Sequence, residues 1–171
     1  DTEEWISYRS RLETSARIGA EEYGLTVGIH AHAAGFMDFE PELERLLSEV
    51  DENILKICFD TGHHSYAGFD PVKFMQKYMS RISYMHFKDI NPKVKQNVIE
   101  NRTGFYDACG QGIFCNLGDG DVDFSIVRKI LLENSFEGWC TVEQDCDPLL
   151  DPNPLSDAKL NREYLEAIGF S

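Results

Sequence analysis

The 171-residue chain has little positive charge, no CxxC pair and no glycine-rich phosphate loop after a strand. Its 16 Lys and Arg stand against 30 Asp and Glu, which gives a formal net charge of -14. Because nucleic-acid backbones are bound by clusters of basic side chains, the sequence predicts no nucleic-acid partner. The charge suits a bound cation and a small polar substrate, although acidity also serves solubility alone.

The five cysteines are odd in number, and their spacing does not suggest a disulfide framework. Cys58 and Cys140 lie inside apolar runs, where a cysteine usually acts as a small buried hydrophobe. A reducing, cytoplasmic location is therefore predicted. No apolar run approaches the length of a membrane span and no signal peptide is visible, so no membrane association is expected.

Apolar runs typical of strands alternate along the chain with segments of helical periodicity. Four strands are expected at 25–29, 54–59, 82–87 and 139–142, and five helices at 3–23, 41–50, 70–79, 123–137 and 156–168. Residues 90–123 carry scattered glycines and no strong periodicity. So long an irregular stretch indicates a functional loop, with room for a short helix of its own.

The strands are almost wholly apolar, which is typical of a parallel sheet covered by helices on both faces. An open doubly wound sheet and a (β/α) barrel both satisfy the α/β order. No GxGxxG follows any strand, so the usual nucleotide fingerprint is missing. Polar groups at several different strand ends favour the barrel, whose site collects residues from many strands at one face. The length fits a single domain over 1–171.

All five histidines lie in three short segments, and each segment closes an apolar run. A fourth run ends in carboxylates in the same way. Residues two apart on a strand point to the same face, so these pairs are expected to face one site. The pairs two apart are His30 with His32, His86 with Lys88, and Glu143 with Asp145. Asp60 and His63 are separated by a Thr-Gly turn that can fold the histidine back toward the carboxylate, and His64 follows them.

Imidazoles and carboxylates at the ends of successive buried strands indicate one divalent-metal site on the sheet. Such nitrogen and oxygen donors suit Mn²⁺, Co²⁺, Zn²⁺ or Mg²⁺, and the share of histidine weighs against Mg²⁺. A single histidine at a strand end is more often a hydrogen-bonded structural residue, but the clustering of all five reverses that expectation. His64 is expected to be a loop residue outside the site. Lys88 is balanced between a solvated side chain and a catalytic or substrate-binding one.

A second acidic segment, 118–123, looks at first like a calcium-binding loop. It lacks the Glu that the twelve-residue EF-hand loop requires. A turn followed by a helix cap at Asp123 is the better interpretation.

Four motifs resemble the xylose-isomerase-like barrel superfamily of sugar isomerases, epimerases and AP endonuclease relatives. They are Phe59-Asp60-Thr61-Gly62-His63, Met85-His86-Phe87-Lys88-Asp89, Gly118-Asp119-Gly120-Asp121-Val122-Asp123-Phe124 and Val142-Glu143-Gln144-Asp145. The inosose (2-keto-myo-inositol) dehydratase-like branch is the most similar, and the resemblance spans residues 24–145. It implies a (β/α)8 TIM-type barrel of which this chain carries strands 4 to 8, with the short seventh strand near 113–117.

The resemblance also implies a set of site residues. The family takes one metal ligand from each of four strands, which here implies Asp60, His86 and Glu143. The remaining family ligand is usually Glu; this chain has His30 in that place, and His32 is the competing candidate. His63 matches a histidine that contacts substrate, and the expected substrate-facing residues are His32, His63 and Lys88. Mn²⁺ or Co²⁺ is the expected metal, with Zn²⁺ and Mg²⁺ as alternatives.

Three earlier strands of such a barrel have no counterpart in this chain, which also does not begin with Met. The sequence is therefore expected to be either a fragment of a longer protein or an incomplete barrel. Exposed parallel edges invite pairing, so a homo-oligomer or a pairing with the missing strands is expected rather than a monomer.

The activity that the resemblance implies is a metal-dependent lyase, a dehydratase acting on a keto-inositol or similar cyclic polyol ketone. Glu143 or a histidine would remove the proton next to the carbonyl, and His63 or Lys88 would protonate the departing hydroxyl. A divalent-metal sugar isomerase or 3-epimerase shares the first step and is the alternative. An abasic-site nuclease is disfavoured by the charge and by the lack of any histidine after His86, and a non-catalytic binding protein is the remaining rival.

Overall fold

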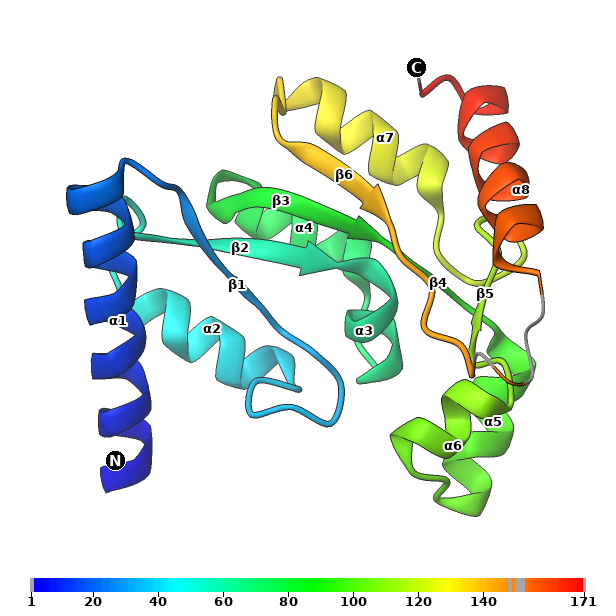
Figure 1. Ribbon diagram of the computed structural model, residues 1–171, viewed down its shortest axis with the longest axis horizontal. Coiled ribbons are helices and arrows are strands. Elements are labelled where there is room, and N and C mark those ends of the chain that lie inside the picture. Colours follow the sequence, from blue (N-terminus) through cyan, green and yellow to red (C-terminus); the bar gives the residue numbers. More distant parts are fainter. Residues whose placement is uncertain (1, 148, 150–152, 171) are drawn as a thin grey trace.

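The computed structural model describes residues 2–147, 149 and 153–170. A parallel sheet of four strands in the order β1-β2-β3-β6 forms its centre (Figure 1). These strands are β1 (Val27–His30), β2 (Leu55–Asp60), β3 (Ile82–Phe87) and β6 (Trp139–Val142). The predicted α/β class is confirmed, and β3 and β6 have the bounds that the apolar runs predict.

Helices occupy the connections between strands, as the periodicity predicts. They are α1 (Glu3–Tyr23), α2 (Glu40–Glu49), α3 (Thr61–Tyr66), α4 (Pro71–Tyr78), the 3-10 turn η1 (Met79–Arg81), α5 (Pro92–Asn101), α6 (Phe105–Gly110), α7 (Phe124–Glu133) and α8 (Pro154–Ala167). The side chains of Asp70 and Asp123 cap α4 and α7 by accepting hydrogen bonds from backbone N–H groups in the first turn of each helix. The cap expected at Asp123 is confirmed. Within the described residues, no helix is both long and apolar enough to cross a membrane.

The hydrophobic core lies between one face of the sheet and helices α2, α4 and α7. Alternate residues of β2, namely Leu55, Ile57 and Phe59, are buried there, while Lys56 and Cys58 on the other face are less buried. The expectation of helices on both faces is therefore wrong for the described chain. Alternation of a packed and a more open face is what the strands of a barrel show, with helices only outside.

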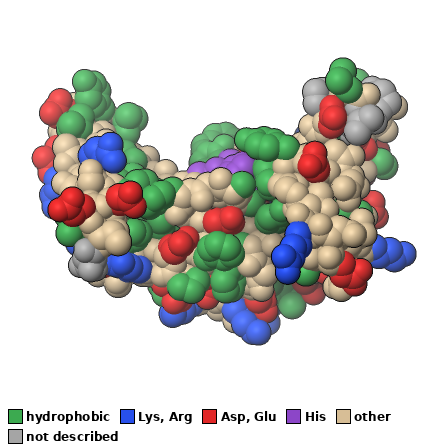
Figure 2. Space-filling view, turned by 90° about the horizontal axis from the view of Figure 1, so that it is seen from below, with side chains coloured by type: hydrophobic (Ala, Val, Ile, Leu, Met, Phe, Trp, Pro, Cys, Tyr) green, Lys and Arg blue, Asp and Glu red, His purple; other side chains and the backbone are tan. Residues whose placement is uncertain are grey.

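The open face of the sheet is concave. Figure 2 shows the molecule hollowed between two raised ends, with histidine side chains at the base of the hollow. Parallel register sets Asp60 beside His86 and Phe87 beside Val142. The carboxyl ends of all four strands therefore meet at one edge of the sheet.

The long segment between β3 and α7 forms a small unit of its own. Strand β4 (Asp89–Ile90) pairs antiparallel with β5 (Phe114–Cys115), and helices α5 and α6 lie between them. A second cluster of buried side chains, built around Ile90, Ile113 and Phe114, holds this unit together. A short strand does lie near 113–117 as predicted, but its expected place as the seventh strand of the barrel is wrong, because β5 pairs antiparallel with β4 and β6 pairs directly with β3.

The sheet ends at β1 on one side and β6 on the other, and neither has a further strand partner among the described residues. Figure 1 shows α1 beside β1 at one end of the sheet and α8 on the opposite side of the molecule, beyond β6. Trp139 of β6 is 77% exposed. Two parallel edges of this kind are unusual in an isolated protein, because they present unpaired backbone groups.

Candidate active site

Each strand of the sheet delivers one polar side chain to the edge where the four strands end. His30 is the last residue of β1, Asp60 is the last residue of β2, and His86 lies on β3. Glu143 follows β6, where its backbone N–H donates to the carbonyl of Phe87 and continues the register of the sheet. The parallel ladder thus gathers the metal-binding residues that the sequence predicts.

Asp60 uses its two carboxylate oxygens differently. Oδ1 accepts a hydrogen bond from the backbone N–H of His63 at 2.8 Å, which caps α3. Oδ2 faces His30 Nε2 at 3.6 Å and His86 Nδ1 at 3.5 Å. The helix cap therefore fixes the rotamer that aims the second oxygen at the two imidazoles.

The side-chain atoms that converge here, which have the chemistry of metal ligands, are buried but form no hydrogen bonds. His30 Nε2, Asp60 Oδ2 and His86 Nδ1 have no hydrogen-bond partner within the described residues. His86 Nδ1 also closely approaches Glu143 Oε2. Buried polar atoms normally find a partner, so several that face one point without bonding are suited to a shared cation. Two imidazoles and two carboxylates also form a chemically suitable donor set for a divalent metal, and the residues fit one.

The electrostatics of this centre favour positive charge. Burial alone would raise the pKa of Asp60, but the His30 and His86 imidazoles and the Lys88 ammonium hold it well below its usual range. Asp60, Cys58 and Glu143 raise the pKa of His86 to about 12. The hydrogen bond to His86 and the charge of Lys88 lower the pKa of Glu143 to about 2, although burial alone would raise it. The carboxylates that hold a proton on His86 are equally suited to hold a metal ion.

Lys88 lies directly behind this centre and is fully buried. Its Nζ donates to Glu143 Oε1 at 3.0 Å and to Asp145 Oδ2 at 2.9 Å, and lies 3.3 Å from Asp60 Oδ2. Burial lowers the pKa of Lys88, but Asp60, Asp145 and Glu143 outweigh it and raise the pKa overall. Lys88 is therefore a charged residue of the site and not a solvated lysine.

His63 and His32 lie together, with His63 in contact with Lys88. His63 Nε2 accepts from Lys88 Nζ at 2.9 Å, and mainly burial lowers the pKa of His63 to about 4. The His32 ring lies 3.8 Å from the His63 ring, and His32 Nδ1 donates to the carbonyl of Ala33 at 2.7 Å. Phe105 of α6 contacts both rings. The structure thus places the predicted substrate-facing residues in one group with Asp145, beside the metal-binding group.

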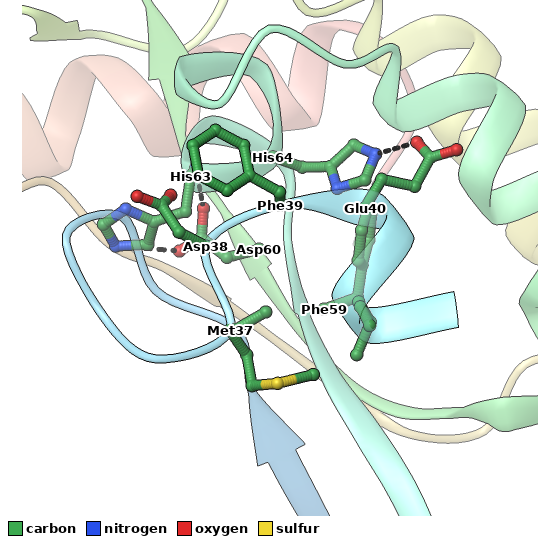
Figure 3. Close-up of a pocket in the computed structure, with 10 residues that line it drawn as sticks. Met37, Asp38, Phe39, Glu40, Phe59, Asp60, His63 and His64 are labelled. Atoms are coloured by element: carbon green, nitrogen blue, oxygen red, sulfur yellow. Dashed lines mark hydrogen bonds and ion pairs between the residues drawn. The ribbon is translucent and has the colours of Figure 1, made fainter. Parts of the chain in front are cut away.

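His64 is not the loop residue that the sequence suggests. It lies in α3, is buried, and pairs through Nε2 with Glu40 Oε2 at 3.0 Å. Figure 3 shows this pair on one side of a small pocket, with Asp60 and His63 on the other side. Burial lowers the pKa of His64 to about 4. The six-residue helix is too short for its periodicity to be recognised in the sequence.

Asp89 holds the loop before α7 in place, a role that was not predicted from the sequence. Its buried carboxylate accepts backbone hydrogen bonds from Gly118, Gly120, Val122 and Ile90. A Cβ on Gly120 would overlap that carboxylate, so the glycine is required there. The acidic segment 118–123 therefore wraps around a buried anion with its N–H groups. The repeated glycines of this segment were the feature of the sequence that could have indicated such an anion-binding turn.

The buried Asn161 of α8 was also missed. Its Oδ1 accepts from the backbone N–H of Leu117 at 2.7 Å, and its amide donates to Gln144 Oε1 at 3.4 Å. These bonds connect α8 to the loop before α7 and to the strand end that carries Glu143. A lone Asn in a polar helix gives no signal in the sequence.

Comparison with known proteins extends these observations. Residues 1–168 match a family model described as a xylose isomerase-like TIM barrel. An inosose dehydratase of Clostridium botulinum (strain Alaska E43 / Type E3) is 35% identical over 164 residues, which are 96% of this chain and 54% of that protein. An inosose dehydratase of Clostridium beijerinckii is 36% identical over 169 residues, 98% of this chain and 56% of that protein. The chain spans about half the length of these curated relatives.

Solved structures share the architecture at low identity. The probable 3-DHS dehydratase AsbF of Bacillus anthracis superposes with a TM-score of 0.72 and 23% identity, covering 93% of this chain and 55% of that one. The IOLI protein, solved with a zinc atom, gives a TM-score of 0.70 and 15% identity, covering 98% of this chain and 58% of that one. At such identities these likenesses concern the fold.

Proposed function

The chain belongs to the xylose isomerase-like TIM barrel family, and on that premise we propose that it carries the metal site of a dehydratase. The substrate class is a keto-inositol or a similar cyclic polyol ketone. The observation that carries the proposal is the convergence of buried, unbonded donor atoms from His30, Asp60 and His86 beside Glu143. The inosose dehydratase names of the relatives support the substrate class.

His30, Asp60, His86 and Glu143 would hold the ion. A bound divalent metal supplies a Lewis acid for the substrate carbonyl and its neighbouring hydroxyl. Mn²⁺ or Co²⁺ is the proposed metal, and the zinc atom of the IOLI structure supports divalent binding by this fold without fixing the ion. His30 is proposed over His32 because its Nε2 faces Asp60 Oδ2, whereas His32 lies against His63.

Glu143 is the proposed base for the proton next to the carbonyl. Its carboxylate is ionised, as a base must be, and Lys88 holds Oε1 while Oε2 lies at the metal-binding group. Orientation by a fixed ammonium keeps the carboxylate at one position, which favours proton removal from one carbon of the substrate.

His63 is the proposed donor to the departing hydroxyl. Lys88 donates to His63 Nε2, so the neutral imidazole carries its own proton on Nδ1, which has no hydrogen-bond partner in the described chain. As Nδ1 gives its proton to the leaving oxygen, Lys88 can supply the proton that Nε2 takes up. Lys88 then acts through His63, because all three of its N–H groups are used.

The test is direct: the purified chain is incubated with Mn²⁺ and 2-keto-myo-inositol, and the enone-type absorbance of the dehydrated product is followed. A signal that is lost in His86→Ala supports the proposal. A ketohexose is supplied separately, because isomerisation or epimerisation without water loss would instead support the alternative function. No turnover of either substrate by a metal-loaded chain would contradict both.

We also propose that residues 1–171 form one domain, and that this domain acts with its two sheet edges covered. A homo-oligomer or a pairing with the missing barrel strands would do this, and the unpartnered β1 and β6 support it. The proposed partner in solution is a small polyol or sugar, not nucleic acid. We propose a reducing, cytoplasmic location, with the five cysteines in no disulfide within the described residues.

A further inference from the structure

Glu143 presents its two oxygens to two different positively charged groups. Oε2 lies against His86 at the metal-binding group, and Oε1 accepts from Lys88 Nζ at 3.0 Å. Asp60 Oδ2 is also shared, since it faces both imidazoles of that group and lies 3.3 Å from Lys88 Nζ. Carboxylates that lie between two cations in this way are typical of sites with two metal ions.

The Lys88 ammonium contacts two members of a second set of side chains with the chemistry to bind a metal ion. His32, His63 and Asp145 offer ligand atoms that all lie within 4.8 Å of one another. Lys88 Nζ lies 2.9 Å from His63 Nε2 and 2.9 Å from Asp145 Oδ2. Two imidazoles and a carboxylate are good donors for first-row divalent metals.

We propose that His32, His63 and Asp145 form a second cation site, which the Lys88 ammonium fills in the native protein. The chain then binds one divalent metal instead of two, and Lys88 provides the second positive charge. This inference rests on the metal site of the proposed function and specifies that the site holds one metal ion.

The fold fixes Lys88 at that position. Thr61 Oγ1 donates to the carbonyl of Lys88 at 2.7 Å and accepts from its N–H at 3.0 Å. A Cβ on Gly62 would lie 2.7 Å from Lys88 Cβ and 2.8 Å from Lys88 Cδ, so the stem of the lysine needs a glycine beneath it. An ammonium held by its backbone and its stem cannot leave when metal is added.

The charges agree with a single metal ion. Asp60, Glu143 and Asp145 bring three negative charges, and the Lys88 ammonium together with one divalent ion balances them. A second divalent ion beside Lys88 would leave excess positive charge in a buried place, which is unfavourable. Lys88 thus positions His63, Glu143 and Asp145. While its side chain fills the second cation site, a second metal ion has no place there.

Zinc binding tests the inference without any turnover. The purified chain is dialysed against Zn²⁺ at defined free concentration, and bound zinc is measured per chain. We expect one zinc in the native chain, two in Lys88→Ala, and one in Lys88→Ala combined with His63→Ala. Lys56→Ala, at the opposite end of β2, is the control and should bind one.

Further variants keep the test informative if Lys88→Ala does not fold, which circular dichroism would reveal. His32→Ala and Asp145→Asn leave Lys88 in place and should still bind one zinc, because neither residue belongs to the proposed metal-binding group of His30, Asp60, His86 and Glu143. Two zinc ions in the native chain, one in folded Lys88→Ala, or none in His32→Ala would each overturn the inference. A chain that shows the expected zinc counts but dehydrates no substrate would reject only the proposed function.

Discussion

Asp60 joins the fold to the site through the two oxygens of one carboxylate. Oδ1 caps α3, and Oδ2 faces the imidazoles of β1 and β3. The two roles can be separated by substitution, because an asparagine keeps an oxygen for the cap but loses the charge.

Asp60→Asn should bind Mn²⁺ more weakly by at least about 100-fold, since losing a ligand costs more than losing an outer partner. Its free energy of unfolding should also fall, because the new amide would face the buried Lys88 ammonium without a negative charge, while the cap remains. Asp60→Ala should lose the metal equally and, in addition, about 1 kcal/mol of stability from the missing cap. Calorimetric titration and urea unfolding measure the two effects. Equal stability of both variants would contradict the cap.

Gly62→Ala should destabilise the chain by about 1–3 kcal/mol, because the new methyl group meets the stem of Lys88 in a packed interior. Gly104→Ala is the matched control, since a Cβ there has open space around it. Urea unfolding of the two variants gives the comparison. Similar midpoints for both would mean that Lys88 can move aside.

At the scale of elements, Asp89 ties the unit formed by β4, α5, α6 and β5 to the loop that leads to α7. The carboxylate receives four backbone N–H groups, three of them from the loop that leads to α7. Because Asp89 follows Lys88 directly, this anchor also sets where the lysine enters the site. The unit and the active site are therefore coupled through the end of β3.

Asp89→Asn should cost about 1–3 kcal/mol, because its amide group would oppose N–H donors in a buried place. Hydrogen exchange should rise in 114–124 more than in β2. Asp121→Asn, whose side chain is exposed on the same loop, is the control and should change neither quantity. Unchanged protection of 114–124 in Asp89→Asn would contradict the anchor.

The elements also show what the sequence could predict. Strands such as β3 and helices such as α1 have an unbroken apolar pattern, so their bounds follow from periodicity. The two-residue strands β4 and β5 have no pattern of their own, and they form only because Asp89 and the second hydrophobic cluster hold them together. The four candidate metal ligands could be predicted because each lies at or next to the end of a strand. They are His30, Asp60, His86 and Glu143. The role of Asn161 could not, since its partners are far away in the sequence.

For the whole molecule, the least favourable feature is the pair of open sheet edges at β1 and β6, where backbone groups have no strand partner among the described residues. Trp139 on β6 is 77% exposed, and the groove between α7 and α8 beside it is lined by apolar side chains such as Leu131, Phe136 and Phe170. An exposed strand edge next to an apolar groove is a surface that normally receives another strand. The proposed pairing of edges would bury both.

The chain alone should self-associate through these edges, with a mass that rises with concentration in light scattering after gel filtration. Trp139→Lys places a charge on the edge of β6 and should shift the equilibrium toward the monomer. Tyr106→Lys is the control, because Tyr106 is 86% exposed but lies on α6, away from the sheet edges. A concentration-independent monomer for the native chain would contradict this prediction.

The central claim is that the ends of four parallel strands form one divalent-metal site. Its most direct test is the amount of Mn²⁺ bound per chain after equilibrium dialysis of the native protein and His86→Ala, with His64→Ala as a histidine control outside the site. We expect one Mn²⁺ in the native chain and in folded His64→Ala, and none in His86→Ala. A folded native chain without stoichiometric metal, or His86→Ala that binds as tightly as the native chain, would contradict the claim.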